Sequence, residues 1–225
     1  MNSLLISRTG TYLTVQDFGR FRYQHLGISP SGAMDHRILI ALESIINHHG
    51  NQFLEFAYVG PSLKITQGAI KACVGGDCKI FVQKQNNTQI EHKPYTSINL
   101  FEGDELNIHN TIDSVYGYIA FENGLGLKPC LDSYATDTKS QIGSIPRPLQ
   151  IGDSFHIKEK VRSWDLAFND EINIEKQLDF KVFAGPQLNF FSDETIQQFA
   201  STPYTITSQS DRMGLRLKGE PVISQ

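Results

Sequence analysis

Three absences narrow the class of this protein. No run approaches the roughly 20 apolar residues of a membrane-spanning helix, and the first residues become polar too soon for a signal peptide. The three cysteines cannot all pair with one another, which favours reduced thiols and predicts a cytoplasmic protein. Positive charge is not in excess, because the net charge is −4, so we expect neither a nucleic-acid nor a membrane partner.

Common ligand motifs are absent as well. The sequence has no Gly-x4-Gly-Lys-Ser/Thr loop and no Gly-x-Gly-x-x-Gly turn after a strand. A nucleotide would therefore need a different phosphate-binding loop. The histidines form no His-x3-His or His-x-His set, and Cys73-x4-Cys78 lacks a second cysteine pair. We therefore predict no metal site. Cys130 has no neighbouring base that would activate it as a nucleophile.

What is present is the composition of a soluble globular protein. The 225 residues are 40% hydrophobic and 20% charged, enough for one large domain or two small ones. Short apolar runs separated by turn residues dominate, and several alternate with polar residues as half-buried antiparallel strands do. Strands are predicted around residues 4–6, 53–59, 63–65, 69–74, 79–82, 97–101, 105–108 and 115–121. This spacing predicts a mainly β protein, a barrel or a sandwich.

Two helices are expected among the strands. Residues 35–48 place five apolar side chains on one face, with Asp35 as N-cap and Gly50 as the stop. The second helix covers about 193–200 and is capped by Ser192. A helix that begins at Asp35 directs amide donors and a positive dipole end toward the polar segment before it, which predicts an anion site there.

Two polar, glycine-punctuated clusters are the candidate site. Arginine offers a planar fork that fits a carboxylate or phosphate, and a carboxylate can orient it or act as a base. The predicted catalytic residues are Asp17, Arg20, Asp35, Asp211 and Arg212, and the predicted substrate-binding residues are Gln24, Ser31, Gly32, Gln209, Ser210 and Arg216. The alternatives are an Arg–Asp pair that only holds a loop in the first cluster, and solvated charges on an exposed strand edge in the second.

The domain organisation follows from a shift in composition. Residues 154–180 are charged with few apolar residues, so we assign domains to 1–155 and 180–225, joined by a connection at 156–179. The segments 59–65 and 184–190 share the pattern Gly-Pro-x-Leu-x-apolar, either because the domains are related or by chance. A second part of about 45 residues is smaller than most independently folding domains. It must pack on the first domain, pair with a partner, or be a remnant.

Eight short motifs occur in an order that resembles a known family. They are Thr14-Val-Gln-Asp-x-Gly-Arg20, Tyr23-Gln-His-Leu-Gly27, Ser31-Gly-Ala-Met-Asp35, Gly50-Asn51, Leu54-Glu55, Gly60-Pro-x-Leu63, Gly185-Pro-Gln-Leu188 and Ser210-Asp-Arg-Met-Gly-x-Arg-Leu-x-Gly219. Together they resemble the biotin-dependent carboxyltransferase family, also called allophanate hydrolase subunit 2. The sequence departs from the family pattern in four places. Arg22 stands where the family usually has glycine, and Glu122-Asn123 replaces a Gly-Gly pair. The turn Leu131-Asp-Ser-Tyr-Ala-Thr136 is degraded, and Pro146-Arg147 replaces a Gly-Arg pair.

The resemblance implies a fold, an activity and partners. The fold is two tandem cyclophilin-like β-barrels, the second incomplete because family members continue beyond the length of this chain. The activity is that of a subunit of an ATP-dependent 5-oxoprolinase, which opens 5-oxoproline to glutamate with a KipI-like partner and a LamB/YcsF-like subunit. ATP is expected through the complex. No covalent biotin is expected, since no Met-Lys-Met attachment site is present. The alternatives are a carboxyltransferase component acting on urea or a related amide, a non-catalytic antagonist of a KipI-type kinase inhibitor, and an inactive, truncated remnant.

Overall fold

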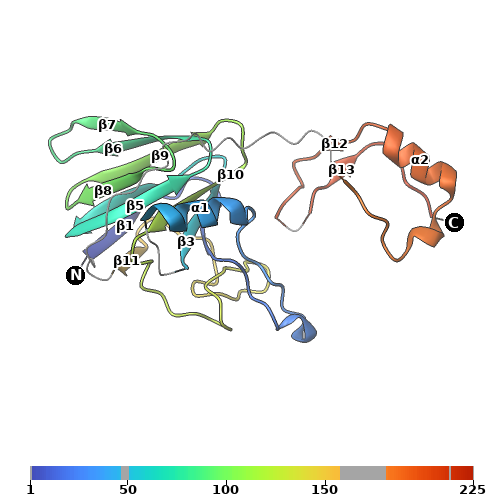
Figure 1. The fold of residues 1–225 in the computed structure, drawn as a ribbon, viewed down its shortest axis with the longest axis horizontal. Coiled ribbons are helices and arrows are strands. Elements are labelled where there is room, and N and C mark those ends of the chain that lie inside the picture. Colours follow the sequence, from blue (N-terminus) through green and yellow to red (C-terminus); the bar gives the residue numbers. More distant parts are fainter. Residues whose placement is uncertain (1, 47–50, 158–180, 213, 225) are drawn as a thin grey trace. The chain divides into compact units, whose positions relative to one another are not determined.

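The chain folds as two compact units, Met1–Ile172 and Asn173–Gln225 (Figure 1). The computed structural model describes residues 2–46, 51–157, 181–212 and 214–224. The first unit contains β1 (Asn2–Arg8), β2 (Thr14–Gln16), η1 (Gln24–Leu26), α1 (His36–Ile46), β3 (Phe53–Ala57), β4 (Ser62–Gln67), β5 (Ala69–Gly75), β6 (Cys78–Gln83), β7 (Gln89–His92), β8 (Ser97–Phe101), β9 (Glu105–Thr111), β10 (Tyr116–Phe121) and β11 (Ser154–Ile157). The second unit contains η2 (Leu188–Phe190), α2 (Asp193–Ser201), β12 (Thr205–Ile206) and β13 (Leu217–Lys218).

Two antiparallel sheets make up the first unit. One has six strands in the order β11-β1-β4-β9-β6-β7, and the other has five in the order β2-β3-β10-β5-β8. The described strands of the second unit form a two-stranded hairpin, β12-β13. The prediction of a mainly β protein with two short α-helices is confirmed.

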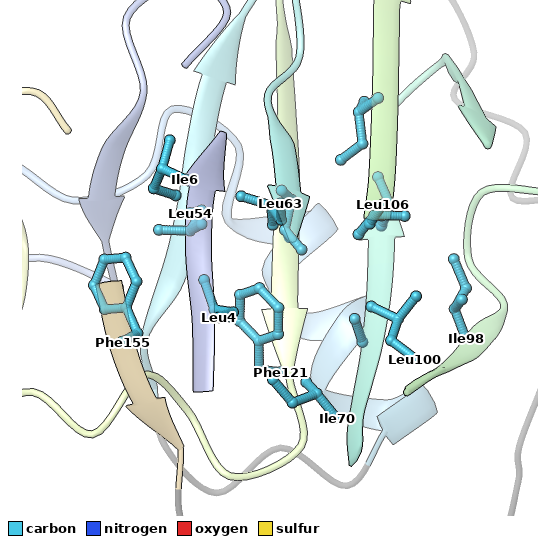
Figure 2. Packing of buried hydrophobic residues seen from close by; sticks show 14 of the residues in the cluster. Leu4, Ile6, Leu54, Leu63, Ile70, Ile98, Leu100, Leu106, Phe121 and Phe155 are labelled. Carbon is cyan, nitrogen blue, oxygen red and sulfur yellow. The ribbon is translucent and has the colours of Figure 1, made fainter. Parts of the chain in front are cut away.

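The hydrophobic core lies between the two sheets, and a smaller cluster lies between the five-stranded sheet and α1. Along β10, Ile119 and Phe121 belong to the core, whereas Tyr118 and Ala120 belong to the cluster with α1. Figure 2 shows the core, where Phe121 lies close to Leu4 of the other sheet. The central strands β3, β10 and β5 are therefore buried on both faces, and β3 and β5 also bury one charged residue each, Glu55 and Lys71.

Helix α1 begins as predicted. Its predicted apolar face, Ile38, Leu39, Leu42, Ile45 and Ile46, is buried, and burying each such side chain contributes about 1.5–3 kcal/mol. The Oδ1 atom of Asp35 accepts the backbone N–H of Arg37 at 3.0 Å, which is an N-cap bond. The predicted stop at Gly50 lies outside the described residues.

All eight predicted strands are present, and the structure adds three that the sequence did not predict in the first unit. Strand β2 is only three residues long, and β7 is a mostly exposed edge strand, so neither shows a clear alternation. Strand β11 corrects the predicted connection, because Ser154–Ile157 pairs with β1 and places Phe155 and Ile157 in the core. The rest of the predicted connection, residues 158–179, lies outside the described residues.

The second unit has little core of its own. Ser192 caps α2 as predicted, since its Oγ accepts the Thr195 N–H at 3.2 Å. No residue in the described ranges 181–212 and 214–224 is fully buried, and the side chain of Phe183 is 92% exposed. The two Gly-Pro-x-Leu segments also fold differently, because the first enters β4 and the second enters η2. Their likeness in sequence is therefore no likeness in local structure.

Candidate functional site

The first cluster lies on a long loop, residues 17–33, between β2 and α1. Two backbone hydrogen bonds join the beginning of this loop to its end, and we call this closed part its neck. Ala33 N–H donates to Asp17 O at 2.8 Å, and Arg20 N–H donates to Pro30 O at 2.5 Å. A Cβ on Gly32, where φ is +89°, would lie 2.8 Å from the Cα and N of Gly19. Glycine at position 32 is therefore required for the two sides of the neck to meet.

Asp17 organises a second loop that lies far along the chain. Its buried carboxylate accepts the N–H of Gly19 at 2.7 Å and the N–H of Tyr134 at 2.6 Å. The hydroxyl of Ser133 lies 3.0 and 2.8 Å from its two oxygens. Asp17 thus joins the neck of the 17–33 loop to the segment around residue 133. Sequence reasoning missed the role of Ser133, because no spacing motif links the two positions.

The guanidinium group of Arg20 binds the same segment at two backbone carbonyls. Its Nε donates to the Cys130 carbonyl at 3.2 Å, and its Nη2 donates to the Ala135 carbonyl at 2.9 Å. The residue is 1% exposed, and Nη1 has no hydrogen-bond partner among the described residues. Within the described part of the first unit, Asp17 and Arg20 form no ion pair with each other. Asp17 and Arg20 thus each hold a loop through hydrogen bonds of their own.

Asp35 sits at the start of α1 with its carboxylate already engaged. Besides capping the helix, it accepts the Nε and Nη2 groups of Arg37 at 3.0 and 2.7 Å. These hydrogen bonds from Arg37 hold the pKa of Asp35 below its usual value. Asp35 therefore serves as a charged cap, and its predicted catalytic role stays a prediction.

Several amides at this helix start, where an anion site is predicted, already have protein acceptors. The Met34 N–H donates to Glu55 Oε2 at 2.9 Å, and the Asp35 N–H donates to the hydroxyl of Tyr118 at 2.9 Å. With the Arg37 N–H bound by Asp35, three amide donors already have protein acceptors. An anion would have to displace two buried side chains to use them. The same contacts fix Met34 and Asp35, which directly follow the 17–33 loop, to the five-stranded sheet.

The other predicted residues of the first cluster lie around the loop. Gln24 is exposed in η1, and Gly32 is buried in the neck. Ser31 is half-buried with φ +53°, and its N–H donates to Ser29 Oγ at 3.2 Å. The structure thus brings Asp17, Arg20 and Gly32 together, while Gln24 lies at the exposed part of the loop.

The second cluster forms the tip of the β12-β13 hairpin. The backbones of Asp211 and Gly214 exchange hydrogen bonds of 3.2 Å, and Ser210 Oγ accepts the Arg216 N–H at 2.7 Å. Gln209, Asp211 and Arg216 are exposed, and Arg212 is half-buried. The predicted roles of these residues, and the alternative of solvated charges on an exposed strand edge, stay predictions.

The thiols of Cys73 and Cys78 are buried. Burial raises the pKa of Cys73 and of Cys78 to about 12, and Cys130 is partly exposed. Within the described ranges, no three His, Cys, Asp or Glu residues are grouped so as to hold a metal ion. None of the helices described is both long and apolar enough to cross a membrane.

Comparison with known proteins gives consistent matches. A family model described as the carboxyltransferase domain, subdomain A and B, matches residues 26–225. The C subunit of 5-oxoprolinase from Escherichia coli (strain K12) is 28% identical over 233 residues, covering 96% of this chain and 69% of that protein. Urea amidolyase of Saccharomyces cerevisiae is 27% identical over 228 residues, covering 95% of this chain and 12% of that protein. The chain thus spans a small part of urea amidolyase.

Solved structures match over nearly the whole chain. The crystal structure of TTHA0988 superposes with a TM-score of 0.78 at 26% identity, covering 97% of this chain and 79% of that one. The urea amidolyase of K. lactis superposes with a TM-score of 0.76 at 23% identity, covering 97% of this chain and 14% of that one, which speaks for the fold alone.

Proposed function

Because the chain belongs to the carboxyltransferase domain family, in the region of subdomains A and B, we propose that it is one component of an ATP-dependent 5-oxoprolinase. In this role it opens 5-oxoproline to glutamate together with a KipI-like subunit and a LamB/YcsF-like subunit. The observation that carries the proposal is the likeness to the C subunit of 5-oxoprolinase over 96% of this chain.

The arrangement around Arg20 supports a site for an anionic substrate. Arg20 is a buried cation whose Nη1 has no hydrogen-bond partner among the described residues. A buried guanidinium N–H without an acceptor is costly, and a carboxylate would satisfy it. Asp17 already accepts bonds from three protein donors, so we assign it to orienting the loops rather than to taking a proton.

ATP does not fit the first cluster of this chain. The sequence lacks a Gly-x4-Gly-Lys-Ser/Thr loop, and the amides of Met34, Asp35 and Arg37 at the start of α1 are engaged by protein acceptors. We therefore assign ATP binding to the complex rather than to these amides.

A second candidate follows from the other relatives. The likeness to yeast urea amidolyase covers 95% of this chain. It supports a carboxyltransferase component that acts on urea or a related amide. The two candidates differ in substrate, so one assay distinguishes them.

The test is co-expression of this chain with the KipI-like and LamB/YcsF-like subunits, followed by measurement of ATP hydrolysis. We expect hydrolysis that depends on 5-oxoproline. Arg20→Lys, which keeps the charge but loses the fork, is expected to lower the rate about 100-fold, a loss of ~2.7 kcal/mol. Arg212→Ala tests the second cluster, and Arg22→Ala, exposed in the same loop as Arg20, is the matched control.

The outcomes separate the candidates. Hydrolysis that depends on urea instead of 5-oxoproline supports the second candidate. A stable complex without hydrolysis on either substrate contradicts both and favours a non-catalytic antagonist. Equal rates for wild type, Arg20→Lys and Arg212→Ala would overturn the site assignment while leaving the activity in place.

A further inference from the structure

The guanidinium group of Arg20 is enclosed, although it is the group to which an anionic substrate is assigned above. The residue is 1% exposed, and its Nε and Nη2 atoms donate to the carbonyls of Cys130 and Ala135. The remaining nitrogen, Nη1, has no hydrogen-bond partner among the described residues. An anion from solution can therefore reach Nη1 only if a neighbouring part of the chain moves. The two neighbouring parts are the 17–33 loop and the segment 130–135.

One hydrogen bond between this loop and this segment lies at the surface. The Tyr23 hydroxyl donates to Asp132 Oδ2 at 2.7 Å, where Asp132 is exposed and Tyr23 is half-buried. The same bond to a carboxylate raises the pKa of Tyr23, so the hydroxyl keeps the proton that it donates. The bonds between Ser133 and Asp17, by contrast, are buried. Water competes for an exposed hydrogen bond, so the bond of Tyr23 opens more readily than those of Asp17.

The turn that carries Asp132 is held in an unfavourable backbone conformation. Cys130 and Ser133 exchange backbone hydrogen bonds of 2.8 and 3.3 Å across this turn. The two residues between them, Leu131 and Asp132, have φ values of +52° and +58°. Positive φ is uncommon for a residue that has a side chain. The turn begins at the carbonyl that accepts the Nε bond of Arg20. When the turn is released from the loop, its backbone can relax, and this carbonyl moves with it.

We propose that the hydrogen bond between Tyr23 and Asp132 is a latch that controls the access of anions to Arg20. With the latch closed, as in this structure, Nη1 is shielded from solvent. With the latch open, the part of the loop at η1 separates from the turn 130–133, while the buried bonds of Asp17 keep the neck in place. This latch depends on the anion site of the proposed function, yet its opening can be measured on this chain alone.

Chemical labelling of arginine by phenylglyoxal, located by peptide mass spectrometry, measures how often Arg20 is accessible. Tyr23→Phe removes the hydroxyl that donates to the latch and keeps the aromatic ring. We expect Arg20 to react at least about threefold faster in this variant than in wild type. Exposed Arg22, in the same loop, is the internal reference and should react equally fast in both proteins. Buried Cys73 should stay unlabelled by iodoacetamide in both, which excludes global unfolding as the cause.

Two further variants make the test specific. Tyr12→Phe is the matched control, because the Tyr12 hydroxyl lies 2.8 Å from Thr138 Oγ1 in a comparable surface bond outside the turn. Arg20 should react in this variant as it does in wild type. Asp132→Asn keeps a side chain that tolerates positive φ but offers a neutral acceptor, so its rate should lie between those of wild type and Tyr23→Phe. The double variant Tyr23→Phe/Asp132→Asn should react no faster than Tyr23→Phe, since the latch is already broken.

Two results would overturn the latch: equal labelling of Arg20 in wild type and Tyr23→Phe, or an equal acceleration in Tyr12→Phe. Acetate tests the anion site separately. At about 0.1 M, compared with chloride at the same ionic strength, acetate should slow the labelling of Arg20 in Tyr23→Phe at least twofold. Without this protection the anion site is wrong, while faster labelling in Tyr23→Phe would still show that Tyr23 controls access to Arg20.

Discussion

Ser133 lies 116 positions after Asp17 in the sequence, yet its hydroxyl is 2.8 and 3.0 Å from the two oxygens of the Asp17 carboxylate. Arg20 adds bonds to the carbonyls of Cys130 and Ala135 on the same segment. Buried side chains therefore join the 17–33 loop to the segment 130–135. A substitution that loosens one of the two segments should loosen the other as well.

Ser133→Ala should destabilise the protein. It removes one donor from a buried carboxylate, and leaving a buried charged group less satisfied costs about 1–3 kcal/mol. Urea unfolding followed by circular dichroism should show a lower free energy of unfolding with an unchanged m-value. Ser140→Ala, exposed in the same region, is the control and should stay within about 0.5 kcal/mol of wild type. Equal stability of both variants would contradict the role of Ser133.

Gly32→Ala should be more harmful than Gly27→Ala, although both glycines have positive φ. A Cβ on Gly27 meets no atom within 4 Å, so its cost is backbone strain of about 1–2 kcal/mol. A Cβ on Gly32 would lie 2.8 Å from the backbone of Gly19, so the neck must open as well. Thermal unfolding of the two variants measures the difference. A melting temperature that is the same for both would show that the neck is not tightly packed.

Arg22→Gly should stabilise the protein. Arg22 is exposed with φ +77°, a conformation that costs a non-glycine residue about 1 kcal/mol or more. Glycine removes that strain, and we expect a gain of about 0.5–1 kcal/mol after the entropy of the unfolded chain is counted. Lys64→Gly, in β4 and with no positive φ, should destabilise instead. A loss of stability in Arg22→Gly would show that this side chain makes a favourable contribution that exceeds the strain.

The thiols should differ in reactivity. Burial raises the pKa of Cys73 and Cys78 to about 12, so at pH 8 both stay protonated in the folded protein. Iodoacetamide at pH 8 should label partly exposed Cys130 alone, and all three thiols in urea. The same pKa shifts predict that stability falls as the pH rises from about 9 toward 12, because the unfolded chain then binds fewer protons than the folded one. Rapid labelling of Cys73 in the native protein would contradict its burial.

The sequence predicted the regular elements well because their signal is local. The apolar face of α1 and the Ser192 cap can be read from neighbouring residues, and so can the eight predicted strands. Strand β7 was missed because an exposed edge strand has no core face, and β11 because its alternation is next to a charged segment. The site shows the same limit: Asp17 and Arg20 are recognisable, but Ser133 is not, because tertiary pairing leaves no spacing pattern. In the sequence, Glu55 is recognisable only as part of a motif. Its hydrogen bond from the Met34 N–H, just before α1, can be identified only from the fold.

The closed neck of the 17–33 loop has a consequence for where this chain tolerates an insertion. The backbone bonds at Asp17, Arg20, Pro30 and Ala33 fix where the chain leaves the sheet and where it returns. Residues beyond the neck, such as exposed Gln24, make none of these four backbone contacts. Insertions or grafted peptides at this tip should leave the sandwich intact, which makes it a practical place for a label.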